Sequence, residues 1–197
     1  MSDKSYLSVY AKSFSWAGFF LPRETLKKCS VLYDFCRVAD NIADDKDKIE
    51  VKEKKFAEFE NDFNQKKFNN LIIKNMWGIM EEFNISIKIV QDLLAGIRSD
   101  IKEKVEINSK KDLLIYSYRV AGTVGLMMAK ILNVTKKNSL KSAIDLGIAM
   151  QLTNISRDVI EDSKNNRFYI EENFETISST VNLANRYYQD SFYAIKS

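Results

Sequence analysis

Proline is nearly absent from this chain, and that limits what it can fold into. One proline and six glycines occur in 197 residues, and apolar residues recur at spacings of three and four. Such spacing places side chains on one face of a helix, and few residues are present that would break one. Segments with the alternating pattern of strands are absent. The sequence therefore predicts an all-α protein.

The helical pattern divides into several segments. We expect helices over residues 22–44, after a solvated turn at 45–48 to about 65, one or two within 75–102, and then over 112–132, 138–163 and 180–195. Pro22 suits the start of the first helix, where a missing N–H costs nothing. The charged segment 102–111 is interpreted as a solvated connection, and Asn165 with Asn166 as a loop.

Two aspartate pairs stand at helical spacing in matching segments. Asp40 and Asp44 lie in FCRVADNIADD, and Asp158 and Asp162 lie in NISRDVIED. Residues four apart share one helix face, about 6 Å apart along the axis. Like charges placed this way repel, and a hard divalent cation with oxygen ligands would relieve the repulsion. For either pair alone, a solvated helix face is an equally good interpretation.

Polar side chains extend each pair into a longer stripe. Tyr33 and Arg37 precede the first pair at helical spacing, and Gln151 and Asn154 precede the second. The other residues of both segments are largely apolar, so each helix would carry a polar stripe inside an apolar surround. Two such stripes facing one another would line a cavity.

Composition excludes some classes of function. A formal charge of +3 with interspersed signs gives no basis for nucleic-acid binding. The longest apolar stretches are shorter than the roughly 20 residues of a membrane span, and the N-terminus lacks a signal-peptide core. Histidine is absent, which removes the commonest general base and zinc ligand. Cys29 and Cys36 are interpreted as reduced structural thiols, so we expect a cytoplasmic protein.

Four segments carry a resemblance to a known family: KSFSWAGFFLP, LYDFCRVADNIADD, YSYRVAGTVGLMMAKIL and LGIAMQLTNISRDVIEDSKNNRFYI. Together they resemble the squalene and phytoene synthase family of head-to-head prenyl transferases, over nearly the whole chain and most closely its bacterial phytoene synthases. The resemblance implies an isoprenoid synthase-type helical bundle around a central cavity. It also implies one domain over residues 1–197 that lacks the family's last helices, since members usually continue beyond LANRYYQDSFYAIKS.

The resemblance implies roles for particular residues. The metal ligands, for Mg²⁺ or for Mn²⁺ in its place, would be Asp40, Asp44, Asn154, Asp158 and Asp162. The catalytic residues would be Asp40, Asp44, Asp158, Asp162 and Tyr116. The substrate-binding residues would be Ser13, Phe14, Tyr33, Arg37, Val120, Gly125, Gln151, Asn154, Arg157, Arg167 and Tyr169. No nicotinamide cofactor is expected.

The activity that the resemblance implies is phytoene synthesis in carotenoid biosynthesis. Diphosphate leaves one geranylgeranyl diphosphate, a second molecule attacks the allylic cation, and a cyclopropyl (prephytoene) diphosphate rearranges to phytoene. The alternative within the family is squalene or dehydrosqualene synthesis from two farnesyl diphosphates. A non-catalytic assembly or scaffold relative is the alternative of another class, although such a protein would not need both aspartate pairs.

Several residues keep a second interpretation. Arg37 and Arg157 could form simple salt bridges to nearby aspartates, and Phe14 and Tyr33 could be core aromatics. Glycine inside a helix costs about 1 kcal/mol relative to alanine, so Gly125 indicates close approach of either a prenyl chain or a neighbouring helix. Hydrophobic substrates further suggest, as a hypothesis, peripheral contact with a membrane surface. The sequence sets no oligomeric state.

Overall fold

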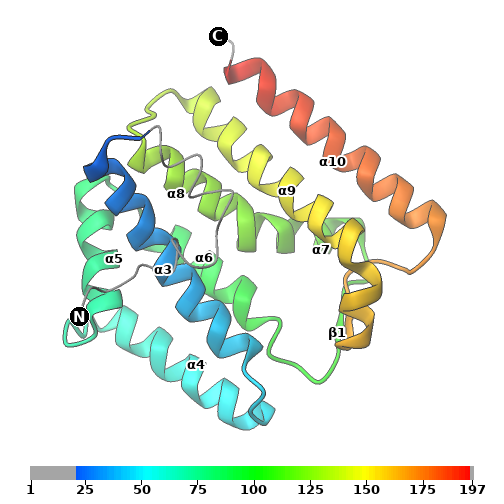
Figure 1. Cartoon of the computed structure of the whole chain (residues 1–197), viewed down its shortest axis with the longest axis horizontal. Helices are drawn as coiled ribbons and strands as arrows, with labels where there is room; N and C mark the ends of the chain where they lie inside the picture. The colour runs from blue at the N-terminus through cyan, green and yellow to red at the C-terminus, as the bar shows by residue number, and fades with distance from the viewer. Residues whose placement is uncertain (1–20, 196–197) are drawn as a thin grey trace.

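A computed structural model describes residues 21–195 of the chain (Figure 1). Its elements in chain order are α3 (Arg23–Asp44), α4 (Ile49–Asn64), α5 (Leu71–Glu82), α6 (Ile87–Arg98), β1 (Val105–Glu106), α7 (Lys110–Ser117), the π-helix η1 (Tyr118–Gly122), α8 (Thr123–Ile131), α9 (Lys137–Lys164), β2 (Arg167–Phe168) and α10 (Phe174–Ile195). The all-α prediction is confirmed. None of the helices in this part of the chain combines the length and apolar character that a membrane span needs.

Side-chain caps explain why two helices begin earlier than expected. The Asn70 side chain accepts a hydrogen bond from the Ile72 amide at 3.0 Å, so α5 begins at residue 71. Likewise the Asn173 side chain accepts one from the Thr176 amide at 2.8 Å, and α10 begins at residue 174. Each asparagine oxygen satisfies an amide that the first helical turn leaves without a partner. Apolar periodicity alone does not reveal these starts.

The prediction that strands are absent was wrong for one short ladder. β1 and β2 run parallel, and they are joined by hydrogen bonds from the Val105 amide to the Asn166 carbonyl, 2.9 Å, and from the Ile107 amide to the Phe168 carbonyl, 3.0 Å. A strand of two residues is too short to display alternation. Val105 is only 6% exposed, so segment 102–111 is more than a solvated connection: it holds the chain around Phe168 in place.

The expected helix over 112–132 is interrupted by the π-helix η1. Helix α6 lies very close to η1, because a Cβ atom on Gly96 would come within 2.7 Å of Arg119 Cβ and 2.9 Å of Val120 Cγ1. Only glycine permits this approach without a shift of the neighbours. The contact brings the end of α6 next to α7 and η1.

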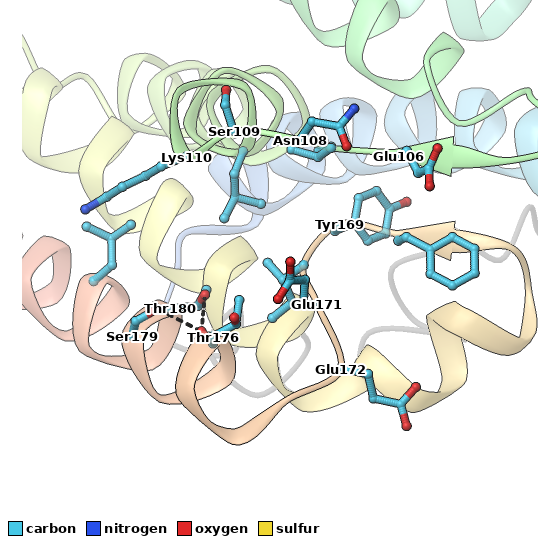
Figure 2. A pocket seen from close by; sticks show the side chains of 15 residues that line it. Glu106, Asn108, Ser109, Lys110, Tyr169, Glu171, Glu172, Thr176, Ser179 and Thr180 are labelled. Atoms are coloured by element: carbon cyan, nitrogen blue, oxygen red, sulfur yellow. Dashed lines mark hydrogen bonds between the residues drawn. The ribbon is translucent and has the colours of Figure 1, made fainter.

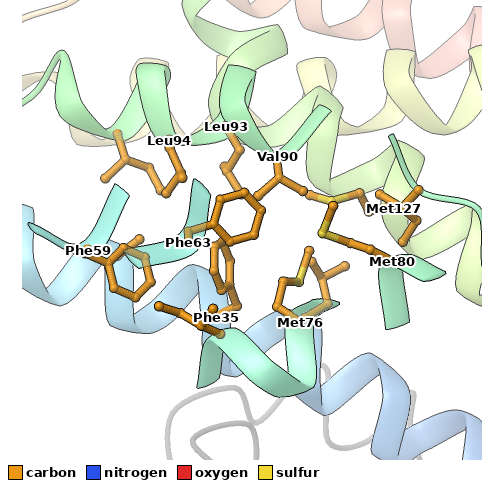
Figure 3. Close-up of a cluster of buried hydrophobic side chains, with 14 of the residues drawn as sticks. Phe35, Phe59, Phe63, Met76, Met80, Val90, Leu93, Leu94 and Met127 are labelled. Carbon is orange, nitrogen blue, oxygen red and sulfur yellow. The ribbon is translucent and has the colours of Figure 1, made fainter. Parts of the chain in front are cut away.

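Two apolar clusters stabilise the fold. The first lies between α3, α4, α5, α6 and α8 and centres on Phe35 and Phe63, which are fully buried (Figure 3). The second lies between α7, α9 and α10 and includes Leu152 and Ile155. Helices α9 and α10 lie side by side (Figure 1). Because α3 belongs to the first cluster and α9 to the second, their polar stripes meet at the boundary.

Candidate active site

The aspartate ends of the two polar stripes, with Gln151 and Asn154, line one pocket of about 240 Å³. Asp40 and Asp44 reach it from α3, and Asp158 and Asp162 reach it from α9. The other lining residues are Ala43, Ile97, Asp100, Tyr116, Val120, Gln151, Asn154, Ile155, Arg167 and Tyr169. Residues more than a hundred positions apart in the sequence thus share one concave polar surface.

The surroundings of Asp40 disfavour its ionised form. Burial, and secondly the nearby carboxylate of Asp44, raise the pKa of Asp40 from 3.8 to about 6. Arg37 acts in the opposite direction and lowers this pKa. Burial also raises the pKa of Asp162. Both shifts mean that the ionised carboxylates lack the stabilisation that water would give them, and a bound cation would supply it.

Two arginines bind carboxylates of the predicted metal site. Arg167 Nη2 donates to Asp44 Oδ1 at 2.6 Å, which links β2 to α3. Arg157 donates to its neighbour Asp158 through Nε at 2.7 Å and Nη2 at 2.6 Å. The bond from Arg157 lowers the pKa of Asp158. These contacts agree with the salt-bridge interpretation of Arg157, and that side chain is exposed rather than among the lining residues.

The donor set fits a hard divalent cation by its chemistry. Carboxylate and amide oxygens are the ligands that Mg²⁺ prefers, and the pocket gathers them from Asp40, Asp44, Asn154, Asp158 and Asp162. Within residues 21–195, no three acidic or thiol side chains converge tightly enough to hold one ion as they stand. Asp44 and Asp158 are instead paired with arginines, which would have to release them. The metal assignment therefore stays a prediction.

Sequence reasoning missed the apolar lining residues Ala43, Ile97 and Ile155 and one polar residue of the pocket, Asp100. It follows the end of α6, and its two oxygens accept hydrogen bonds from Tyr116 Oη at 2.8 Å and Tyr169 Oη at 2.9 Å. The two tyrosine rings stack with centroids 4.8 Å apart, and their hydroxyls lie 3.1 Å from each other. Asp100 has no acidic residue four positions away. Both tyrosines that bond to it are distant in the sequence, so no local pattern marks it.

An apolar groove of about 580 Å³ adjoins the polar pocket. It runs between α8 and α9, and the two cavities share Val120, Gln151 and Asn154. Gly125 lines this groove, and a Cβ atom there would collide with the Ala143 carbonyl oxygen. A Cβ atom on Gly147 would likewise collide with the Ala121 carbonyl oxygen. Close helix packing therefore accounts for Gly125, and the space beside it remains available to an apolar ligand.

The remaining predicted residues lie elsewhere or outside the described part. Tyr33 and Arg37 are half-buried on α3 and are not among the residues that line the pocket or the groove. Ser13 and Phe14 lie outside residues 21–195, so the prediction for them stays a prediction.

A further groove of about 560 Å³ lies beside Tyr169, between the segment from β1 to α7 and helix α10 (Figure 2). It is lined by polar side chains such as Glu106, Lys110 and Thr180 as well as by apolar ones. Among the described residues, Tyr169 alone lines both this groove and the polar pocket. Tyr169 thus forms part of the wall of both cavities.

The described helices surround a polar pocket that opens into an apolar groove, which is the arrangement expected of an isoprenoid synthase-type bundle. Residues 7–174 match the squalene/phytoene synthase family, and the chain belongs to that family. It is 31% identical over 176 residues to a 15-cis-phytoene synthase of Pantoea ananas, covering 83% of this chain and 57% of that protein. A phytoene synthase of Rhodobacter capsulatus is 33% identical over 162 residues, covering 80% and 48%. The chain thus spans about half the length of these relatives.

Solved structures support the same architecture. A dehydrosqualene synthase crystallised with a ligand superimposes with a TM-score of 0.77 at 28% identity, covering 96% of this chain and 74% of that one. The squalene synthase HpnC from Alicyclobacillus acidocaldarius superimposes with a TM-score of 0.76 at 17% identity, covering 93% and 78%, which shows the shared fold alone. The predicted fold class and family are confirmed.

Proposed function

We propose that this protein condenses two geranylgeranyl diphosphates head to head to phytoene, in a reaction that depends on Mg²⁺. The observation that carries the proposal is the continuity of a carboxylate-lined pocket with an apolar groove, through Val120, Gln151 and Asn154. A diphosphate and a prenyl chain need these two environments side by side. The groove volume of about 580 Å³ falls in the range of about 300–1,000 Å³ typical of small-molecule sites.

The chain's own residues would bind and orient the substrate head. When bound, Mg²⁺ would act as a Lewis acid on the departing diphosphate, held by the aspartates and Asn154. Arg167 and Arg157 can exchange their carboxylate partners for diphosphate oxygens, because a guanidinium binds either in the same two-pronged way. Releasing Asp44 and Asp158 would at the same time free those carboxylates for the metal.

The aromatic wall would serve the cationic stage. An allylic cation beside the face of Tyr116 would gain about 2 kcal/mol or more from cation–π attraction in a dry site. The rest of the prenyl chain would lie along apolar side chains of the groove between α8 and α9, such as Val124 and Met128. Excluding water is essential there, since water would trap the cation as an alcohol.

The product of the purified chain tests the proposal. Incubation with Mg²⁺ and labelled geranylgeranyl or farnesyl diphosphate, followed by identification of the extracted hydrocarbons, distinguishes the alternatives. A C40 hydrocarbon supports phytoene synthesis. A C30 hydrocarbon supports squalene or dehydrosqualene synthesis, the candidate favoured by the 28% identical dehydrosqualene synthase. No product from the folded chain refutes catalysis by this chain and favours a non-catalytic relative.

Site variants sharpen that assay. Asp40→Ala and Asp158→Ala should abolish turnover that depends on Mg²⁺ while the helical circular dichroism spectrum stays unchanged. Asp45→Ala is the matched control, because Asp45 lies just past α3, is exposed and pairs with Lys55 outside the pocket. Contact with a membrane surface remains a separate hypothesis, and absence of sedimentation with lipid vesicles would contradict it.

A further inference from the structure

We propose that Asp100 is a positioning residue that holds the Tyr116 and Tyr169 pair as a water-excluding wall of the reaction pocket. This inference rests on the proposed function for its consequence, and on the described geometry for its premise. Neither the family's paired aspartates nor their metal chemistry requires an acid at this position.

The hydrogen bonds of Asp100 account for both of its oxygens. Oδ2 accepts from Tyr116 Oη at 2.8 Å and Oδ1 accepts from Tyr169 Oη at 2.9 Å. Burial raises the pKa of Asp100, and the hydrogen bonds from Tyr116 and Tyr169 act in the opposite direction because they favour the charged carboxylate. One carboxylate thus fixes two phenol rings, which stack at 4.8 Å with an interplanar angle of 24°.

Three separate parts of the chain converge on this carboxylate. Gly96 allows α6 to approach the π-helix, which brings Asp100 beside Tyr116 at the end of α7. The ladder between β1 and β2 holds the backbone at Phe168, so that the next residue, Tyr169, lies within hydrogen-bonding distance of Asp100. Tyr116 is 8% exposed and Tyr169 is 6% exposed. Asp100 thus joins two buried tyrosines that are distant from it in the sequence, which agrees with a role in holding their rings.

Tyr169 lines two cavities, and this position explains why its ring must be held. They are the polar pocket and the separate groove of about 560 Å³ that Glu106, Lys110 and other polar residues line. Figure 2 shows Tyr169 at the edge of that groove, facing the segment that follows β1. Displacing the ring would open the polar pocket on the side that Tyr169 closes, so that more solvent reaches the site of the allylic cation from the groove.

The chemical consequence is a change of product. In the intact pocket the cation is attacked by the double bond of the second prenyl diphosphate. In an opened pocket a water oxygen attacks instead, forms a C–O bond and releases a proton, so that a prenyl or cyclopropylcarbinyl alcohol leaves together with the diphosphate already expelled. The alcohol oxygen comes from water and can be labelled.

The test compares Asp100→Asn with Tyr169→Phe and the control Asp92→Asn in ¹⁸O-labelled water. Asp92 lies on the same helix, and its carboxylate accepts from Lys88 at 2.9 Å outside the pocket. We expect the labelled alcohol to rise relative to hydrocarbon on the order of tenfold in Asp100→Asn, the effect of losing a hydrogen bond to a charged group. KM should change little, and Asp92→Asn should match the wild type. Tyr169→Phe keeps the ring and should show a smaller rise, and it decides the matter if Asp100→Asn does not fold.

A second measurement does not depend on activity. In protein labelled with ¹³C at the tyrosine ring carbon that bears the hydroxyl, two resonances should report phenols bonded to a carboxylate. Asp100→Asn should move both toward the ordinary tyrosine position. Unchanged resonances in this variant, or a wild-type ratio of alcohol to hydrocarbon, would overturn the inference. A wild-type chain without any product would refute the proposed function, and the resonances would then decide the positioning by themselves.

Discussion

The buried carboxylate of Asp40 allows the metal prediction to be tested without substrate. Burial and Asp44 raise its pKa from 3.8 to about 6, so the folded state holds this proton more tightly than the unfolded state does. Between about pH 4 and pH 6 the folded state carries the extra proton, and stability must fall as the pH rises. Above about pH 6 the whole penalty is present, roughly 3 kcal/mol at about 1.4 kcal/mol per pKa unit.

Asp40→Asn should remove this penalty. In EDTA at about pH 7.5 we expect the variant to unfold with a free energy roughly 2–3 kcal/mol higher than the wild type, a rise in Tm of about 4–12 °C for a chain of this length. The gain should nearly vanish at about pH 4, where Asp40 of the folded wild type is protonated. Urea unfolding followed by circular dichroism at both pH values measures it.

The same variant should lose its response to metal. Mg²⁺ with inorganic diphosphate should stabilise the wild type by binding the folded state, and should leave Asp40→Asn unchanged. Asp45→Asn is the control, because Lys55 lowers the pKa of exposed Asp45 and its loss brings no stabilisation. An Asp40→Asn variant no more stable than the wild type in EDTA would refute the reasoning that this carboxylate is destabilising until a cation binds.

Other substitutions test the helix contact, the arginine and the groove. Gly125→Ala should lower the free energy of unfolding by about 1–3 kcal/mol through overpacking. Gly78→Ala should raise it by about 0.5–1 kcal/mol, because nothing lies within 4 Å of a Cβ atom at that position. Equal melting temperatures of the two variants would contradict this. Arg167→Ala should cost less than about 1 kcal/mol of stability, because its partner Asp44 is exposed, yet should weaken diphosphate binding measured by calorimetry; unchanged affinity would count against its role. Ser139 lines the groove about 18 Å along α9 from Gln151. Ser139→Phe should therefore reduce the kcat/KM for geranylgeranyl diphosphate relative to that for farnesyl diphosphate by about tenfold or more. An unchanged ratio of the two kcat/KM values would show that the prenyl chain lies elsewhere.

Local periodicity determined the helices and the two polar stripes. Residues three and four apart share a helix face whatever the rest of the chain does, so Asp40 with Asp44 and Asp158 with Asp162 could be paired from their spacing. Helix starts were less predictable where a side-chain cap set them, as Asn173 does for α10. The strand at Val105 left no pattern, because two residues are too few to alternate.

Only the tertiary structure decided which distant groups meet. Asp100 binds tyrosines 16 and 69 residues further along the chain, and Arg167 binds Asp44 across 123 residues. Such contacts depend on how close whole helices can approach, which Gly96, Gly125 and Gly147 control through neighbouring atoms that no local pattern reveals. The sequence by itself determined the helical architecture and the carboxylate chemistry of the candidate site, and helix packing determined the aromatic wall and the partners of its charges, because packing joins residues whose positions in the sequence are unrelated.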